Sequence, residues 1–272
     1  MPEIVEVETI KRDLENSKEV LRHKIIDIEV FSNSIIDKNS KNNLNLIKNK
    51  TIKNIQRIGK YLVFELDDLY LVVHLRMTGH IFLKDKKYIN QKHDHLFLIF
   101  ENNKKIVYFD PRRFGKFYVK SDLLFLKNLG SDVLSENFIF DEFYENLKTK
   151  NKKIKTLLLD QNFIAGLGNI YVDEVLFSAK INPLKLASSL KGAEALNLYN
   201  SIKDVVNSAL IHRGTSLGKN RSNFSSINED FGNNQKFLLI HTRKTCPGCK
   251  RDVEKIKISQ RTSYYCKYCQ KL

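Results

Sequence analysis

The sequence predicts an α+β fold in three parts: an N-terminal helix with an antiparallel β-sandwich, a helical domain and a C-terminal four-cysteine hairpin. Three observations predict this arrangement. Short β-like segments follow one another up to about residue 120, helical spacing dominates after Gly130, and every cysteine lies at or after residue 246. We expect the domains to span residues 1–130, 131–228 and 229–272.

The first part begins with a helix, because Val7, Ile10 and Leu14 recur at helical spacing. Asp67–Asp68 and Asn102–Asn103 stand between β-like segments, where hairpin turns are expected. The β-like segments are IIDIEVF (25–31), TIKNIQRI (51–58), YLVFEL (61–66), LYLVVHL (69–75), HIFL (80–83), HLFLIF (95–100), KIVYFD (105–110) and GKFYV (115–119). Short strands at this spacing indicate an antiparallel sandwich or a barrel.

The second part is predicted to be helical. Helices are expected over residues 154–162, 170–179 and 189–211, and the second has apolar residues at i, i+3, i+4 and i+7 from Val172. The segment 213–234 is rich in Ser, Asn and Gly and lacks apolar periodicity, so we expect a mobile loop there.

The cysteines form two pairs, Cys246-Pro-Gly-Cys249 and Cys266-Lys-Tyr-Cys269. Each pair fits a tight knuckle that directs two sulfurs at one point, and two knuckles on a short hairpin complete a tetrahedral thiolate site. A single structural zinc ion is the favoured interpretation. Two disulfides are the alternative, and a reducing compartment argues against them.

The charge balance favours a polyanionic partner, because 46 Lys+Arg against 31 Asp+Glu give a net charge of +15. Nucleic acid is favoured, while acidic membranes and ribosome association stay open, and lysine-rich usage can also reflect an AT-rich genome. No apolar stretch of about 18 residues spans a membrane, and the N-terminus lacks a signal-peptide pattern. We therefore expect a cytoplasmic protein, associated with the nucleoid if its partner is DNA.

The start of the chain is a candidate reaction centre. Removal of the initiator Met would expose the secondary amine of Pro2, and an α-amino group with a pKa near 8 is partly neutral at physiological pH. A neutral amine can attack C1′ of a deoxyribose, with the Glu3 carboxylate moving protons. The alternative is an ordinary helix start with proline and an acidic first turn.

Two further motifs suit a phosphate backbone. In AGLGN (165–169), two glycines allow a tight turn and Asn169 is expected to cap the next helix, where free amides attract phosphate. The lysine run 148–155 lies upstream of it. An ordinary helix corner and a solvated helix start are the respective alternatives.

A third motif, DPRRFG (110–115), pairs two arginines with a phenylalanine. Arginine can hold a phosphate or reach into a base stack, and phenylalanine can wedge between bases. The alternative is a hairpin with exposed arginines and a buried Phe114.

In order along nearly the whole chain, these segments resemble the formamidopyrimidine-DNA glycosylases, also called 8-oxoguanine DNA glycosylases. MPEIVEVETI is similar to that family's MPELPEVET, and RIGKYL, HLRMTG, KHDH, DPRRFG, LLLDQNFIAGLGNIYVDE and CPGC…QRTSYYCKYCQ follow in the family's order. The resemblance implies a helix-two-turn-helix domain in the middle of the chain. It also implies a glycosylase and AP lyase that excises oxidised purines from double-stranded DNA. No feature of the sequence calls for oligomerisation, so we expect a monomer.

The resemblance further implies roles for single residues. Pro2 would be the Schiff-base nucleophile and Glu3 its proton donor, while Lys60 and Arg261 would serve β- and δ-elimination and contact phosphates. Residues matching DNA-contact positions are His74, His93, Arg112, Arg113, Lys150, Lys155 and Asn169. Residues matching those that fill the gap left by the extruded base are Met77, Arg112 and Phe114. Alternatives are a core position for Met77, a strand-start charge for Lys60 and a hairpin-turn charge for Arg261.

The sequence departs from the family pattern at three places. Position 5 is Val rather than Pro, LLIHTRKTC replaces a Tyr-Gly-Arg run, and the loop HRGTSLGKNRSNFSS (212–226) is unusual. Two other functions stay open: an endonuclease VIII-like glycosylase for oxidised pyrimidines, and a non-catalytic zinc-finger DNA-binding protein.

Overall fold

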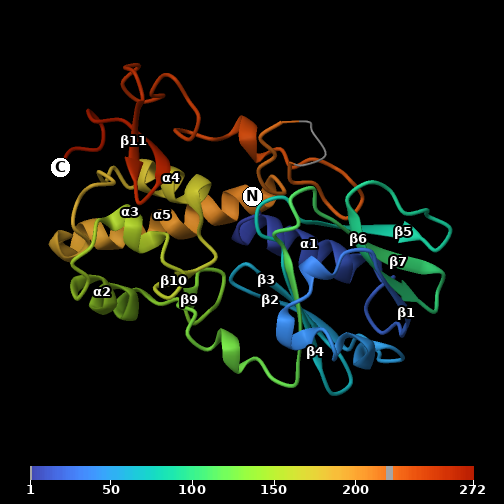
Figure 1. Ribbon diagram of the computed structural model, residues 1–272. Helices are drawn as coiled ribbons and strands as arrows, with labels where there is room; N and C mark the ends of the chain where they lie inside the picture. The colour runs from blue at the N-terminus through green and yellow to red at the C-terminus, as the bar shows by residue number, and fades with distance from the viewer. Residues whose placement is uncertain (1, 219–222) are drawn as a thin grey trace. The chain divides into compact units, whose positions relative to one another are not determined.

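The computed structural model describes residues 2–218 and 223–272, and these fold into two compact units (Figure 1). The first unit takes the chain up to Lys127 and again over His212–Gln235. The second comprises Asn128–Ile211 and Lys236–Leu272. The chain thus returns to the first unit over a segment that the sequence-based boundaries divided between the helical domain and the hairpin. The mobile loop expected over 213–234 lies partly outside the described residues, at 219–222.

The first unit contains two four-stranded antiparallel sheets, which confirms the predicted sandwich. One sheet has the order β1 (Ile25–Val30), β6 (Asp94–Phe100), β7 (Lys104–Phe109), β5 (His80–Asp85). The other has the order β2 (Asn54–Ile58), β3 (Tyr61–Glu65), β4 (Tyr70–His74), β8 (Lys116–Lys120). Asp67–Asp68 and Asn102–Asn103 lie in the β3–β4 and β6–β7 connections, as their turn chemistry predicts.

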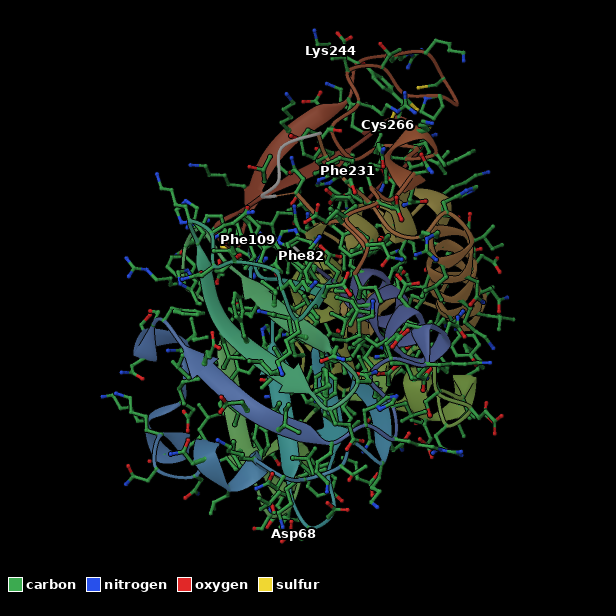
Figure 2. The ribbon with its side chains drawn as sticks, turned by 90° about the vertical axis from the view of Figure 1, so that its right-hand side faces the viewer. Asp68, Phe82, Phe109, Phe231, Lys244 and Cys266 are labelled. Carbon is green, nitrogen blue, oxygen red and sulfur yellow. The ribbon has the colours of Figure 1, made fainter. Side chains whose placement is uncertain are left out.

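The main core of this unit lies between the two sheets and the helix α1 (Ile4–Ser17). The helix contributes the predicted apolar face, and both sheets contribute alternate residues. Core members include Val7, Ile10, Leu14, Leu62, Phe64, Leu71, Val73, Leu96, Leu98, Ile106, Tyr108 and Phe117. A second cluster covers the other face of β5–β7, where the rings of Phe82 and Phe109 lie 6.0 Å apart (Figure 2). Apolar packing on both faces makes this sheet a firm support for the loops at its ends.

The second unit packs α4 (Asn169–Ser178) and α2 (Phe140–Lys148) against the long helix α5 (Gly192–Ile211), as Figure 1 shows. The short helix α3 (Ile154–Leu158) precedes α4, and β9 (Ser131–Asp132) pairs in parallel with β10 (Ile164–Ala165). The hairpin β11 (Glu254–Ile258) and β12 (Arg261–Tyr265) packs on α4. Short 3-10 turns are η1 (Asn33–Ile35), η2 (Lys38–Ser40), η3 (Leu44–Ile47), η4 (Leu124–Leu126), η5 (Ala187–Ser189) and η6 (Asn234–Lys236).

The helices differ from the prediction at two places. Helix α2 was not predicted, and α3 ends at Leu158 instead of 162, because Asp160 turns the chain by accepting a hydrogen bond from the Asn162 amide (3.1 Å). Among the described residues, no helix combines the length and the apolar character needed to cross a membrane.

Candidate functional site

The start of the chain is fixed by the first turn of α1. Glu3 caps the helix through a capping box: its carboxylate accepts from the Glu6 amide, and Glu6 Oε2 accepts from the Glu3 amide at 2.8 Å. Such a box satisfies amides that a helix start leaves open and contributes about 1 kcal/mol. Pro2 is buried and Glu3 is only 1% exposed. The two residues proposed for the chemistry are therefore held at a defined place.

The returning segment of the first unit lies against this helix start. Glu6 Oε1 accepts a hydrogen bond from the Thr215 amide (2.8 Å), and a Cβ on Gly214 would lie 2.9 Å from the same oxygen. Arg213 forms an ion pair with Asp13 of α1 at 2.7 Å. The unusual loop noted in the sequence is thus anchored beside the Pro2–Glu3 start. Val5, the departure within the opening motif, is buried in the first turn of α1.

Lys60 lies in a two-residue turn between β2 and β3, where Gly59 has φ 58° and Ile58 pairs with Tyr61. Arg57 ties this turn to α1, because its guanidinium binds Glu8 (2.8 Å) and donates to the Gly59 carbonyl (3.0 Å). Lys60 therefore occupies a turn and not the strand start proposed as its alternative.

His74 stands at the end of β4, opposite Tyr61 on β3. Burial, reinforced by the positive charges of Arg76 and Lys60, lowers the pKa of His74 to about 3. Its Nδ1 accepts a hydrogen bond from the Arg76 amide (3.0 Å), so the proton of the neutral ring resides on Nε2. His74 is thus suited to offer a neutral N–H donor to a phosphate.

This pKa predicts a pH dependence of stability. The unfolded chain protonates His74 below about pH 6.5, whereas the folded chain does so only near pH 3, so unfolding binds a proton between these values. The stability associated with the neutral ring is fully present above pH 6.5 and falls as the pH drops towards 3. Replacing His74 with Gln should spare ~1–2 kcal/mol of the loss between pH 7 and 4.5. Urea unfolding of both proteins at the two pH values measures this difference, and equal losses would contradict it.

Met77, Arg112 and Phe114 form an exposed cluster, here called the surface trio. The guanidinium of Arg112 lies 4.4 Å from the centre of the Phe114 ring, and its Nη1 lies 3.3 Å from the Met77 sulfur. Met77 is 42% exposed and Phe114 46%. The core position for Met77 and the buried position for Phe114 are therefore both wrong. Grouped apolar side chains at the surface indicate contact with a partner.

Arg113 lies in the loop that follows β7, and His93 directly precedes β6. Arg113 is exposed, with φ 55°. His93 is half-buried, its ring meets Phe109 edge-on at 5.9 Å, and its carbonyl accepts from the Asp110 amide. Arg113 is free to reach a ligand, while His93 mainly supports the loop.

In the second unit, Asn169 and Arg261 lie close together. The Asn169 side chain donates to the carbonyl of Thr262 (2.9 Å), the residue next to Arg261 on β12. The turn Ser259–Gln260, with φ 48° and 63°, leaves Arg261 exposed at the hairpin tip. The predicted capping role of Asn169 is wrong, because Gly168 is the N-cap and Asn169 is the first helical residue. Its side chain links the helix corner to the hairpin.

The lysine run behaves differently at its two ends. Lys150 is exposed, as a phosphate contact requires. The side chain of Lys155 is 0% exposed, and its ammonium binds Asp173 of α4 at 2.5 Å. The prediction that Lys155 contacts DNA is wrong, because α3 turns this residue into the interior, where it neutralises a buried carboxylate.

An acidic pair on α4, which the sequence analysis missed, anchors the hairpin. Glu174 accepts hydrogen bonds from three successive amides, those of Leu239, Ile240 and His241. Asp173 accepts from Lys155, from the His241 ring (2.7 Å) and from the Tyr264 amide (3.3 Å). Burial raises the pKa of Glu174, although these amide hydrogen bonds oppose it. The signal available in the sequence was two acids within an otherwise apolar helix.

We predict that Asp173→Asn destabilises the protein by ~3–5 kcal/mol, because it leaves the Lys155 ammonium buried without a counter-charge. The matched control is Glu145→Gln, which removes the exposed pair with Lys148 and should cost under ~1 kcal/mol. Thermal unfolding midpoints compare the two. A similar, small shift in both variants would contradict a structural role for the buried pair.

The four cysteines meet at one point, as predicted. Their sulfurs all lie within 4.8 Å of one another, with 3.7 Å between Cys246 and Cys269 and 3.4 Å between Cys249 and Cys266. A tetrahedral zinc–thiolate site with bonds of about 2.3 Å places sulfurs roughly 3.8 Å apart, whereas a disulfide requires about 2.05 Å. The sulfurs gather near Cys266 in Figure 2. This donor set fits a tetrahedral metal ion and not two disulfides.

Hydrogen bonds close the turn at each cysteine pair. The Lys250 amide donates to the Cys246 carbonyl (3.0 Å), and the Gln270 amide donates to the Cys266 carbonyl (2.8 Å). The Gln270 side chain in turn accepts from the Cys266 amide (2.8 Å). Four protein ligands leave no open position, so the metal would hold the hairpin and not take part in chemistry.

Fold and site together define a helix-two-turn-helix protein of the DNA-damage glycosylase class. The model of the formamidopyrimidine-DNA glycosylase N-terminal domain matches residues 1–117, and that of the formamidopyrimidine-DNA glycosylase H2TH domain matches residues 129–220. The chain belongs to the formamidopyrimidine-DNA glycosylase family.

Individual relatives match over the whole chain. Formamidopyrimidine-DNA glycosylases from Protochlamydia amoebophila (strain UWE25) and Pelotomaculum thermopropionicum are 36% and 38% identical, with 100% of each chain covered. Among solved structures, Lactococcus lactis Fpg bound to abasic-site DNA has a TM-score of 0.90 and 36% identity, covering 99% of this chain and 100% of that one. A Lactococcus lactis FPG variant with Fapy-dG containing DNA has a TM-score of 0.91 at 36% identity, with 100% of both chains covered.

Proposed function

We propose that this protein is a base-excision-repair DNA glycosylase and AP lyase that removes oxidised purines, 8-oxoguanine and formamidopyrimidines, from double-stranded DNA. The observation that carries the proposal is the Pro2–Glu3 start, buried and fixed by a capping box in a member of this family. A module that only binds DNA has no need of a buried amine and carboxylate at that place.

The chemistry begins after Met1, which lies outside the described residues, has been removed. The neutral Pro2 nitrogen attacks C1′ of the flipped nucleotide, the bond from C1′ to the base breaks, and the base leaves with its electron pair and a proton. Glu3 supplies a proton that opens the sugar. The resulting iminium acidifies the C2′ proton, and loss of this proton expels the 3′ phosphate. Loss of a second proton, from C4′ of the unsaturated iminium, then expels the 5′ phosphate. Lys60 and Arg261 serve these two eliminations.

A further set of residues holds the DNA substrate. Backbone contacts come from His74, Arg113, Lys150 and Asn169, and His93 supports one of the loops. The surface trio enters the space that the extruded base leaves. The net charge of +15 adds a salt-dependent attraction through counterion release. The four cysteines hold one structural zinc ion, and the enzyme acts as a monomer on DNA of the cytoplasmic nucleoid.

Borohydride trapping tests the proposal. The Met-processed protein is incubated with duplexes carrying either 8-oxoguanine or an oxidised pyrimidine, and covalent adducts are separated by electrophoresis. We expect a trapped adduct and strand scission on the 8-oxoguanine duplex. Absence of an adduct on both duplexes would overturn the enzyme assignment, and faster cutting of the pyrimidine lesion would overturn the choice of lesion in favour of an endonuclease VIII-like enzyme.

A further inference from the structure

Two loops that are distant in sequence carry the surface trio. The Met77 loop (residues 75–79) follows β4, and the Arg112 loop (residues 110–115) follows β7. The exposed side chains of the trio contact one another, but exposed contacts alone hold a geometry weakly. The relative position of Met77 and Arg112 must therefore be set underneath, by the parts of the loops that are buried.

Asp110 is the group beneath both loops. It is 0% exposed, and each of its carboxylate oxygens accepts two hydrogen bonds. Oδ1 accepts from the Thr78 hydroxyl of the Met77 loop (2.5 Å) and from the Arg112 amide (3.1 Å). Oδ2 accepts from the Tyr108 hydroxyl (3.0 Å) and from the Gly115 amide (2.9 Å). The Asp110 carboxylate thus joins the Met77 loop to two points of the Arg112 loop, the amides of Arg112 and Gly115.

The Tyr108 hydroxyl also fixes the space between the loops. A Cβ on Gly79 would lie 2.6 Å from this oxygen, and a Cβ on Gly115 only 1.7 Å from it. Each loop therefore packs a glycine against the same phenol. Burial, together with the charge of Asp110, raises the pKa of Tyr108 well above its usual value of 10, so the hydroxyl remains a donor.

Asp110 remains an ionised carboxylate although it is buried. Burial raises the pKa of Asp110, but the hydrogen bonds from Gly115, Thr78, Tyr108 and Arg112 outweigh burial and hold the pKa below its ordinary value. Four donors from two loops converge on an ionised acceptor, and charge-assisted hydrogen bonds of this kind are stronger than neutral ones.

We propose that Asp110 is a positioning residue that fixes Met77 relative to Arg112 and Phe114, and that it acts on extrusion of the damaged base through this surface trio. The inference rests on the proposed function. A trio that is already arranged loses less conformational freedom on entering the duplex, so more of its contact energy offsets unstacking. Disruption of Asp110 should therefore slow removal of a paired base more than cleavage at a site that has no base.

The hydrogen bond between Thr78 and Asp110 gives the sharpest test, because it joins the buried Asp110 carboxylate to the Met77 loop. Thr78→Val keeps the shape and removes the hydroxyl, while Thr78→Ser keeps the hydroxyl and is the matched control. We expect Thr78→Val to lower kcat/KM on a paired 8-oxoguanine duplex by ~10-fold, since small displacements of positioning groups have effects of this order. On a preformed abasic site its loss should stay under ~2-fold, and Thr78→Ser should stay within ~2-fold on both substrates.

Asp110→Asn provides a second variant. Each carboxylate oxygen accepts from a backbone N–H, so an amide NH₂ in either orientation faces a donor. We expect ~30-fold loss on the paired lesion, again with a much smaller loss on the abasic site. Fluorescence of 2-aminopurine beside the lesion reports unstacking directly and should rise less in Thr78→Val and Asp110→Asn than in the wild type and Thr78→Ser.

Three outcomes distinguish the possibilities. Loss confined to the paired lesion, with rescue by Ser, supports the positioning role. Equal losses of kcat/KM on the paired lesion and the abasic site overturn it, and so do equal values of kcat/KM for Thr78→Val and Thr78→Ser. A wild-type protein that cleaves neither substrate overturns the proposed function itself, and the inference falls with it.

Discussion

Retention of Met1 should abolish covalent chemistry, because the Pro2 nitrogen then stays a tertiary amide without a nucleophilic electron pair. Protein made while methionine aminopeptidase is inhibited should give no borohydride-trapped adduct on 8-oxoguanine or abasic-site DNA. Its binding to an uncleavable abasic analogue should persist, since the binding surface involves other residues. Removal of a nucleophile usually costs many orders of magnitude in rate, so activity should fall below detection.

Treatment of the same sample with methionine aminopeptidase is the control, and it should restore trapping in proportion to the fraction processed, as mass spectrometry measures it. Glu3→Gln is a second control: it retains the amine but removes the proton donor, and should slow base excision by ~100-fold or more. A Met-retaining protein that traps as well as the processed one would disprove the role of Pro2.

Removal of metal should unfold the hairpin and stop strand cleavage. The hairpin offers a small core of Ile240, Cys246 and Cys266, with few other apolar residues around it. A structural zinc site of this size contributes on the order of 10 kcal/mol or more to folding, so its loss exceeds what the remaining contacts supply. The hydrogen bond from Asn169 to the Thr262 carbonyl, which holds the strand of Arg261 against α4, would then be lost, and DNA binding should fall with it.

Dialysis against a chelator, followed by gel-shift and nicking assays, measures this loss. Re-addition of one equivalent of zinc should restore binding, whereas magnesium should not, because thiolates prefer the softer ion. Cys249→Ser should reproduce the chelator effect. Full activity in a sample that metal analysis shows to contain no bound metal would disprove the zinc assignment.

Local patterns account for the parts of the fold that the sequence predicted. The strands alternate or form apolar runs between turn signals, and the cysteine spacing defines its own geometry, so both can be recognised without tertiary information. The ordered motifs singled out Pro2, Glu3 and the surface trio as candidate functional residues. The roles of these residues remain predictions until the chemistry is measured.

The errors arose where a distant partner decides the outcome. In the sequence, Lys155 is one member of a lysine run and is expected to be exposed. In the structure it is buried, because it pairs with Asp173 on another helix. In the sequence, Asn169 has the pattern of a helix cap. In the structure its side-chain amide donates instead to the carbonyl of Thr262, far along the chain. Asp110 was recognised only as a member of a motif, because the hydrogen bond that it accepts from Thr78 joins two loops that are distant in sequence. Spacing along a sequence does not reveal contacts of this kind.

The return of residues 212–235 to the first unit bears on how the chain can be divided. The polypeptide passes between the units after residues 127, 211 and 235, so the first unit is not a continuous stretch of sequence. A fragment that ends at Lys127 would leave Glu6 Oε1 without its Thr215 partner and Asp13 without Arg213. Truncation at Lys127 therefore does not yield an intact first unit, and exchange of whole domains between relatives must carry both stretches together.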